Sequence, residues 1–169
     1  KGVNDEIAAE QLEMLMEQME LNDYEQYEIS NFAKEKAYSN HNTNYWRNEK
    51  YLGIGPSAHS YDSKSRQWNV SNNINYIRSI DNNIIPAEIE VLSSFQRLNE
   101  YIMTSLRTVW GCNLDEVQKK FSKNSADLIK KSACDFISDG SVLEENNILK
   151  LSKKGKLIAD HIAASLFVD

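Results

Sequence analysis

The chain has 169 residues, of which 41% are hydrophobic and 26% charged, and its formal net charge is −6. These values exclude a disordered or fibrous chain and predict a soluble protein with one ordinary domain or two small ones. No hydrophobic run is long enough to span a membrane and no signal peptide opens the sequence, so we expect a cytoplasmic protein. Because the first residue is Lys1, we also expect a piece of a longer protein.

The charge is unevenly distributed along the chain. Residues 1–94 contain 8 Lys and Arg against 15 Asp and Glu, whereas residues 95–169 contain 11 against 10. An acidic first half argues against nonspecific binding of nucleic acid, because phosphates attract basic surfaces. The nearly neutral second half gives no electrostatic reason to expect it either.

The first part of the chain predicts alternating helices and strands. Hydrophobic periodicity indicates a first helix, with an apolar face formed by Ile7, Ala8, Leu12, Leu15 and Met19. The expected elements, in chain order, are a helix within 3–23 capped by Asn4, a strand in 24–30, a strand in 50–62 that breaks at the glycines, a return strand in 65–72, a helix over 72–80 capped by Ser71, and a linker over 81–90.

From Ser93 onward the pattern becomes mostly helical. The expected elements are a helix over 93–111 ended by Gly111, a short helix over 113–121 capped by Asn113, a helix over 125–140, a hairpin over 141–152 that turns at Asn146-Asn147, and a helix over 153–167. This order is typical of a winged-helix-like module. The fold class expected for the whole chain is therefore α+β.

A winged helix raises the possibility of DNA binding. Its recognition helix would be 125–139, which contains Lys130 and Lys131 but also three aspartates. A helix that reads the major groove normally has an excess of positive charge. We therefore expect no nucleic-acid partner and favour a structural or protein-contact role for this module.

The two cysteines, Cys112 and Cys134, lie far apart in sequence and lack the spacing of metal ligands. For an ordinary cytosolic domain we expect reduced thiols rather than a disulfide. The sequence has no CxxC or CxxxCxxC motif, so it gives no sign of a zinc or iron–sulfur site.

The stretch SNHNTNYWRNEKYLGIGPSAHS is the richest in groups that coordinate or stack. Its first histidine, His41, has three interpretations: a polar loop residue, a general base without a nearby acid to orient it, or an axial ligand to heme iron. For the heme interpretation, Tyr45 and Trp46 would supply a flat apolar wall, and Asn42 or Asn44 a hydrogen bond.

The glycines of the same stretch, Gly53 and Gly55, also have two interpretations. They can serve a bend or bulge, or they can let a flat ligand or a phosphate approach the backbone. The segment is not a P-loop, because no Lys-Ser/Thr pair follows the glycines. His59 lies too far from His41 to form a local ligand pair, and His161 falls in the last helix.

Several motifs, in order, resemble the oxygen-independent coproporphyrinogen III oxidase-like proteins, which are radical S-adenosylmethionine (SAM) proteins. They are YEISNFAK, HNTNYW, YLGIGPSAHSY and RQWN, followed by RLNEYIMTSLRTVWG and LSKKGKL, and together they cover nearly the whole chain. The pattern HNxxYW, at His41, Asn42, Tyr45 and Trp46, looks most like the branch of heme chaperones.

The resemblance implies two domains: residues 1–92 as the C-terminal part of a partial (β/α) barrel, and residues 93–169 as a winged-helix-like domain. In this family a CxxxCxxC motif holds a [4Fe–4S] cluster that binds and cleaves SAM. The sequence lacks that motif. We therefore expect the cluster and SAM in the full-length protein but not on these residues, which should be inactive alone. A partial barrel exposes a sheet edge, so self-association is also expected.

The resemblance also implies roles for individual residues. His41 would ligate heme iron, with Asn42, Tyr45 and Trp46 beside it, and heme would pass to an acceptor protein. The floor of the site would be formed by Gly53, Gly55 and Ser57. Arg66 would pair with a porphyrin carboxylate, or be a solvated strand residue. The alternatives are the oxidase itself, which decarboxylates coproporphyrinogen III to protoporphyrinogen IX, and a winged-helix adaptor that binds protein or DNA.

Overall fold

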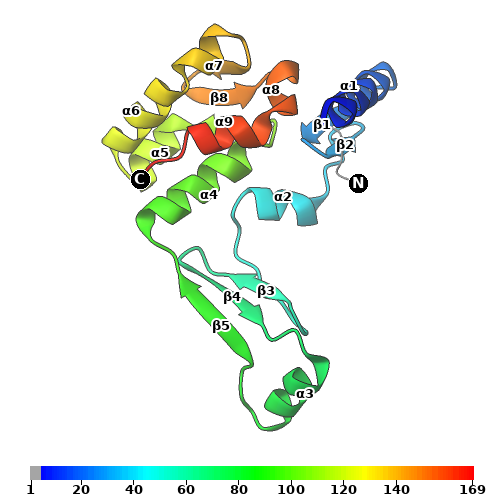
Figure 1. The fold of residues 1–169 in the computed structure, drawn as a ribbon, viewed down its shortest axis with the longest axis vertical. Helices are drawn as coiled ribbons and strands as arrows, with labels where there is room; N and C mark the ends of the chain where they lie inside the picture. Colours follow the sequence, from blue (N-terminus) through cyan, green and yellow to red (C-terminus); the bar gives the residue numbers. More distant parts are fainter. Residues whose placement is uncertain (1–4) are drawn as a thin grey trace.

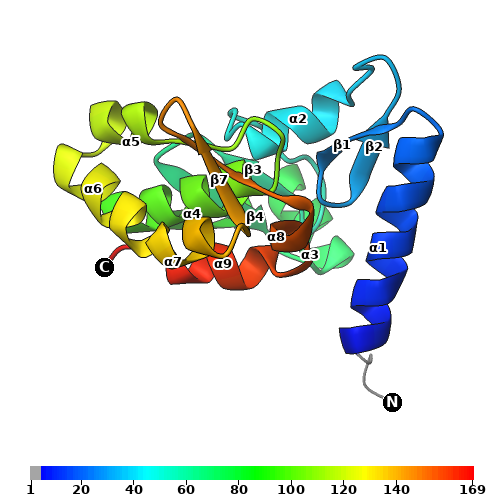
Figure 2. The same ribbon diagram turned by 90° about the horizontal axis from the view of Figure 1, so that it is seen from above.

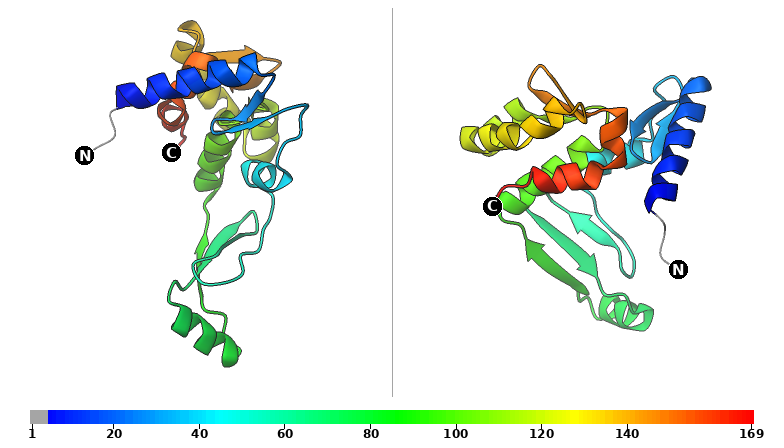
Figure 3. Two further views of the ribbon diagram at one scale, coloured as in Figure 1. Left: turned by 90° about the vertical axis from the view of Figure 1, so that its right-hand side faces the viewer. Right: turned by 45° about the horizontal axis from the view of Figure 1, so that its top comes forward.

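A computed structural model describes the backbone of residues 5–169 and the side chains from residue 7 onward. In the described part, a helical body carries an outlying antiparallel sheet that extends away from it (Figure 1). The sheet ends at a short helix, α3 (Asn73–Asp81), at its far end, whereas the C-terminus lies beside the body (Figure 3). Helices and sheets are thus mixed, which confirms the α+β class.

The first helix, α1 (Asp5–Leu21), is confirmed, but its predicted apolar face is only partly right. It lies along one side of the body, against β1 and α8 (Figure 2). The helix turns the side chains of Leu12, Met16 and Met19 toward the body, whereas Ile7, Ala8 and Leu15 are exposed. The predicted cap, Asn4, lies outside the described residues.

A two-stranded hairpin follows this helix. The predicted strand is β1 (Glu25–Glu28), and it pairs antiparallel with β2 (Asn31–Ala33), which the sequence did not indicate. The backbone N–H of Ile29 donates to the carbonyl of Arg107 at 3.1 Å, and the N–H of Val109 donates to the carbonyl of Tyr27 at 3.1 Å. These bonds attach the hairpin to the segment that follows α4.

The residues that resemble the heme-chaperone motif form a short helix, α2 (Asn40–Trp46). This helix was not predicted, because asparagine and threonine are weak helix formers. It is begun by Ser39, whose hydroxyl accepts a hydrogen bond from the N–H of Asn42 at 3.3 Å.

The outlying sheet has the strand order β3-β4-β5, all antiparallel. Its strands are β3 (His59–Tyr61), β4 (Ser65–Asn69) and β5 (Ala87–Val91). The first two were predicted, but β5 lies largely in the predicted linker, where the alternation of AEIEV marks a strand. The helix α3 (Asn73–Asp81) is capped by Asn72 and not by Ser71, because the Asn72 side chain accepts from the N–H of Asn75 at 3.0 Å.

The central helix of the body is α4 (Ser94–Leu106). Ser93 and Gln96 form a capping box at its start. The helix ends five residues before the predicted end, because the chain turns at Thr108 to pair with Glu28 of the hairpin. Gly111, which was predicted to end the helix, lies instead in the turn that follows it, with φ of +71° and its N–H bonded to the carbonyl of Thr108 at 3.2 Å.

The remaining elements complete a compact core. They are β6 (Cys112–Asn113), α5 (Leu114–Lys120), α6 (Lys123–Ser132), α7 (Cys134–Ser138), β7 (Val142–Glu145), β8 (Ile148–Leu151), α8 (Lys153–Leu157) and α9 (Ala159–Ser165). The helices predicted over 125–140 and 153–167 are each divided in two. The hairpin is confirmed, with positive φ at both turn asparagines, and β6 adds an unpredicted third strand in the order β6-β8-β7.

The core is built almost entirely from this second part of the chain. Leu98, Ile102 and Leu106 of α4 are at most 1% exposed and pack with residues of α5, α6, β8 and α9. Ile29 of the hairpin belongs to the same cluster. The hairpin is therefore part of the body, although 60 or more residues of chain separate it from the other core residues.

Candidate functional site

The four residues of the HNxxYW pattern all lie on α2, between the body and the outlying sheet. His41 is exposed, and its ring lies edge-to-face against Tyr45, with centroids 5.0 Å apart. Tyr45 packs on Tyr51 at 4.6 Å, and Tyr51 approaches Tyr61 at 6.1 Å. A row of aromatic rings therefore runs from the histidine to the sheet.

The rings of Tyr45, Tyr51 and Tyr61 line a cavity of about 470 Å³, a volume in the range of small-molecule and cofactor sites. Its lining includes Asn42, Tyr45, Trp46, Tyr51, Tyr61 and Arg66. Helix α4 contributes Glu100, Met103 and Thr104 to the same lining. We call this the aromatic cavity. His41 is on the same helix but does not line it.

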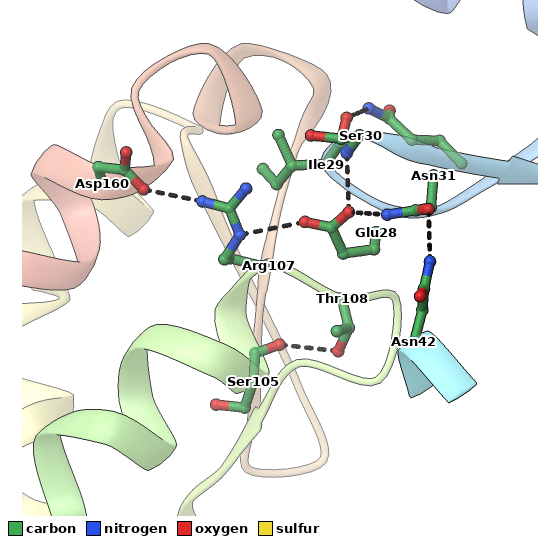
Figure 4. Close-up of polar contacts among 10 residues, drawn as sticks. Glu28, Ile29, Ser30, Asn31, Asn42, Ser105, Arg107, Thr108 and Asp160 are labelled. Atoms are coloured by element: carbon green, nitrogen blue, oxygen red, sulfur yellow. Dashed lines mark hydrogen bonds and ion pairs between the residues drawn. The ribbon is translucent and has the colours of Figure 1, made fainter. Parts of the chain in front are cut away.

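Beside the aromatic cavity lies a buried ion pair that the sequence did not predict (Figure 4). The carboxylate of Glu28 is 1% exposed and accepts hydrogen bonds from the N–H of Ser30 at 2.9 Å, from the Asn31 amide and from Arg107 Nε at 3.1 Å. Arg107 Nη1 reaches Asp160 of α9 at 2.9 Å. A buried carboxylate needs such partners, because burying a lone charge is costly.

This network reaches the motif helix at two points. The side-chain amide of Asn42 donates to Oδ1 of Asn31 at 3.0 Å, and the guanidinium of Arg107 lies 5.3 Å from the ring centre of Trp46. The only sequence signal was Glu28 itself, a carboxylate between the buried Tyr27 and Ile29, which implies a paired charge.

Arg66 lines the aromatic cavity, but its guanidinium is already paired. Nε contacts Glu90 and Nη1 contacts Glu100, both at 2.7 Å. The hydrogen bond to Glu90 raises the pKa of Arg66, and the same bond lowers the pKa of Glu90. Burial raises the pKa of Glu100. To pair with a porphyrin carboxylate, Arg66 would have to give up its contact with Glu90 or Glu100.

The glycine-rich segment lies apart from the aromatic cavity. Gly53 has no room for a side chain, since a Cβ would collide with the backbone of His59, and Gly55 has φ of +109°. The Asn69 amide donates to the carbonyl of Gly55 at 2.9 Å. Ser57 lines a different cavity, of about 430 Å³, together with His59, Trp68 and Glu88 of the outlying sheet and its loop. The structure therefore does not bring the two motifs into one cavity.

The described residues do not fit an iron–sulfur cluster. Both cysteines are free, with Cys112 buried and Cys134 exposed. Within residues 7–169 no group of three or more His, Cys, Asp or Glu side chains could hold a metal ion. Likewise, no helix between residues 5 and 169 is both long enough and hydrophobic enough to cross a membrane.

The fold resembles that of a radical SAM enzyme. The solved structure of coproporphyrinogen III oxidase (HemN) from Escherichia coli superposes with a TM-score of 0.70, over 93% of this chain and 40% of that chain, at 15% identity. Residues 92–158 match the family described as HemN C-terminal domain. The resemblance to the coproporphyrinogen III oxidase-like radical SAM proteins is thus confirmed, with the HemN C-terminal domain matched over residues 92–158.

The curated relatives include proteins named heme chaperone HemW. That of Bacillus subtilis is 30% identical over 91% of this chain and 41% of its own length, and that of Lactococcus lactis is 26% identical over 95% and 42%. A Danio rerio protein, named radical S-adenosyl methionine domain-containing protein 1, mitochondrial, is 44% identical over 55 residues, which are 32% of this chain and 12% of its own length. The chain spans about two fifths of the length of the two HemW proteins.

Proposed function

We propose that the chain binds heme and takes part in its transfer to an acceptor protein, with His41 as ligand to the iron. The observation that carries this proposal is the exposed His41 ring, which packs against Tyr45, a residue that lines the aromatic cavity. The relatives named heme chaperone support the same function. An exposed ligand suits a carrier, because the acceptor must reach the iron to take over its coordination.

The chemistry of the described residues fits heme. An imidazole is a common axial ligand of heme iron, and the side chain of His41 makes no hydrogen bond within the described part of the chain, so its ring nitrogens stay available. The rings of Tyr45, Tyr51 and Tyr61 offer stacking surfaces for a flat macrocycle. The Asn42 amide is bound to Asn31, so its role would be to orient α2.

We propose the same division of the chain that the family resemblance implies: residues 1–92 in the barrel region and 93–169 in a winged-helix-like domain. The order α4, β6, α5, α6, β7, β8 supports the second part. The [4Fe–4S] cluster and SAM would be bound by other residues of the whole protein, since this sequence has no CxxxCxxC motif. We also propose that the protein is cytoplasmic.

The proposal is tested by titrating hemin into the chain and into His41→Ala while recording the Soret band. The matched controls are His59→Ala and His161→Ala, because both histidines are also exposed. We expect the Soret spectrum to change only in His41→Ala. Identical spectra for this variant and the unchanged chain would remove His41 as a ligand.

The oxidase alternative needs a separate assay on the whole protein. Decarboxylation of coproporphyrinogen III without transfer of heme to any acceptor would contradict the chaperone function. Transfer of heme without decarboxylation would support it.

A further inference from the structure

A third cavity, of about 370 Å³, has an unusual lining of positive charge. It lies where α4 and α5 meet the end of α2 and the turn between β3 and β4. Four cations line it, with two tyrosines beside them: Arg47, Lys64, Arg97, Lys120, Tyr61 and Tyr101. No carboxylate is among its lining residues. We call it the basic cavity.

Two of these cations are already held by the protein. The Arg47 guanidinium lies over the ring of Trp110 at 4.4 Å. Lys120 pairs with Glu116 of its own helix at 2.8 Å. These two therefore contribute positive charge but are less free to move onto a ligand.

Arg97 and Lys64 differ, since neither side chain forms an ion pair or a hydrogen bond with any described residue. Nε of Arg97 is also buried without a hydrogen-bond partner. A buried guanidinium N–H is a strong donor that proteins normally satisfy. The unpaired Nε of Arg97, in a cavity lined by three other cations and no carboxylate, points to an anion as the ligand of this cavity.

The basic cavity and the aromatic cavity are neighbours. Asn48 and Tyr61 line both of them. Helix α4 contributes residues to both cavities. Arg97 and Tyr101, one turn apart, line the basic cavity, whereas Glu100 and Thr104 line the aromatic one. One ligand could therefore place a flat apolar part against the tyrosines and a charged part near Arg97.

We propose that the basic cavity binds the carboxylate groups of the porphyrin whose ring lies in the aromatic cavity, with Arg97 as the main contact and Lys64 as the second. This inference rests on the proposed function and adds a site to it. A guanidinium matches a carboxylate with two parallel hydrogen bonds. Arg66, the cation predicted from the sequence for this role, is neutralised by Glu90 and Glu100, whereas Arg97 is not.

The test compares metal-free protoporphyrin IX with its dimethyl ester, which has the same ring but no carboxylates. We expect the chain to bind the diacid about tenfold more tightly than the ester. Arg97→Gln should remove this difference by weakening the diacid about tenfold while leaving the ester unchanged. Lys64→Gln, at an exposed turn residue, should have a smaller effect in the same direction. The matched control is Arg78→Gln, because Arg78 is exposed on α3 and lines neither cavity.

Folding of each variant is checked by far-ultraviolet circular dichroism, and Lys64→Gln decides the matter if Arg97→Gln does not fold. Equal binding of diacid and ester by the unchanged chain, or an unchanged preference in a folded Arg97→Gln, overturns the inference. Because these porphyrins lack iron, the result does not depend on His41. If hemin gives the same Soret spectrum with His41→Ala as with the unchanged chain, but the diacid still binds more tightly than the ester, only the role of His41 as iron ligand is refuted. If the Soret spectrum changes in His41→Ala but diacid and ester bind equally, only the carboxylate site is refuted.

Discussion

The carboxylate of Glu28 and the guanidinium of Arg107 form an ion pair with an Oε1–Nε distance of 3.1 Å, although 79 residues separate them. The pair joins the β1–β2 hairpin to the end of α4. Through Asn31 and Trp46 it also fixes the helix that carries His41. The placement of the candidate iron ligand thus depends on a contact remote from it in sequence.

Glu28→Gln should lower the free energy of unfolding by about 2 kcal/mol, because a hydrogen bond to a charged group is lost in a buried place. The cost stays moderate because Asp160 still pairs with Arg107. The measurement is the urea midpoint at constant m-value. Glu145→Gln removes a carboxylate from the exposed pair with Lys150 and should change stability by less than about 0.5 kcal/mol. Equal effects of the two substitutions would contradict the importance of the buried pair.

Gly111 and Gly140 form a matched pair, since both have φ above +70° but only Gly111 is crowded. A Cβ at Gly140 meets nothing within 4 Å, so Gly140→Ala should cost about 1 kcal/mol for the left-handed backbone alone. A Cβ at Gly111 collides with the Leu149 carbonyl, so Gly111→Ala should cost about 3 kcal/mol. Thermal or urea unfolding of both variants measures the difference. A cost for Gly111→Ala no larger than for Gly140→Ala would show that the crowding is absent.

The two thiols should differ sharply in reactivity. Burial raises the pKa of Cys112 to about 11, and its side chain is fully buried, whereas Cys134 is exposed. Ellman's reagent at pH 8 should therefore detect one fast thiol in the native chain and two in urea. Cys134→Ser should leave no fast thiol. Two fast thiols in the native chain would mean that the core around Cys112 opens readily.

Tyr101 should make the protein less stable in alkaline solution. Burial raises the pKa of its phenol to about 12 from an ordinary value of 10.0. Between pH 10 and 12 the unfolded chain loses this proton while the folded chain keeps it, so the free energy of unfolding falls as pH rises. Denaturant titrations at several pH values should show a shallower fall for Tyr101→Phe. The same slope in both proteins would indicate that Tyr101 ionises without penalty.

Local signals in the sequence identified most elements of the body. The spacing of Leu98, Ile102 and Leu106 predicted α4, and the Asn146-Asn147 turn predicted the last hairpin. They failed where tertiary contacts decided the outcome. Pro86 predicts a linker over 81–90, yet β5 pairs along its whole length with β4. The early end of α4 follows from pairing with a hairpin that lies far away in sequence.

The candidate site was predictable only in its residue types. The motif resemblance identified His41, Tyr45 and Trp46, and the structure places them on one helix beside a cavity. The sequence could not show that Arg66 is paired with two glutamates, because these are 24 and 34 residues away from it in the chain. The same holds for Arg97, which is identified only by the absence of a partner in the described part of the fold.

Because Ile29 belongs to the central core, the hairpin and the body form one cooperative unit. The outlying sheet and α3 form a second. The hairpin and the body share that core and exchange backbone hydrogen bonds, so they should lose their structure in one step. Helix α3 buries no side chain, and the outlying sheet buries few. Amide protons of β3–β5 should therefore exchange with solvent long before those of α4, at a free energy well below that of global unfolding.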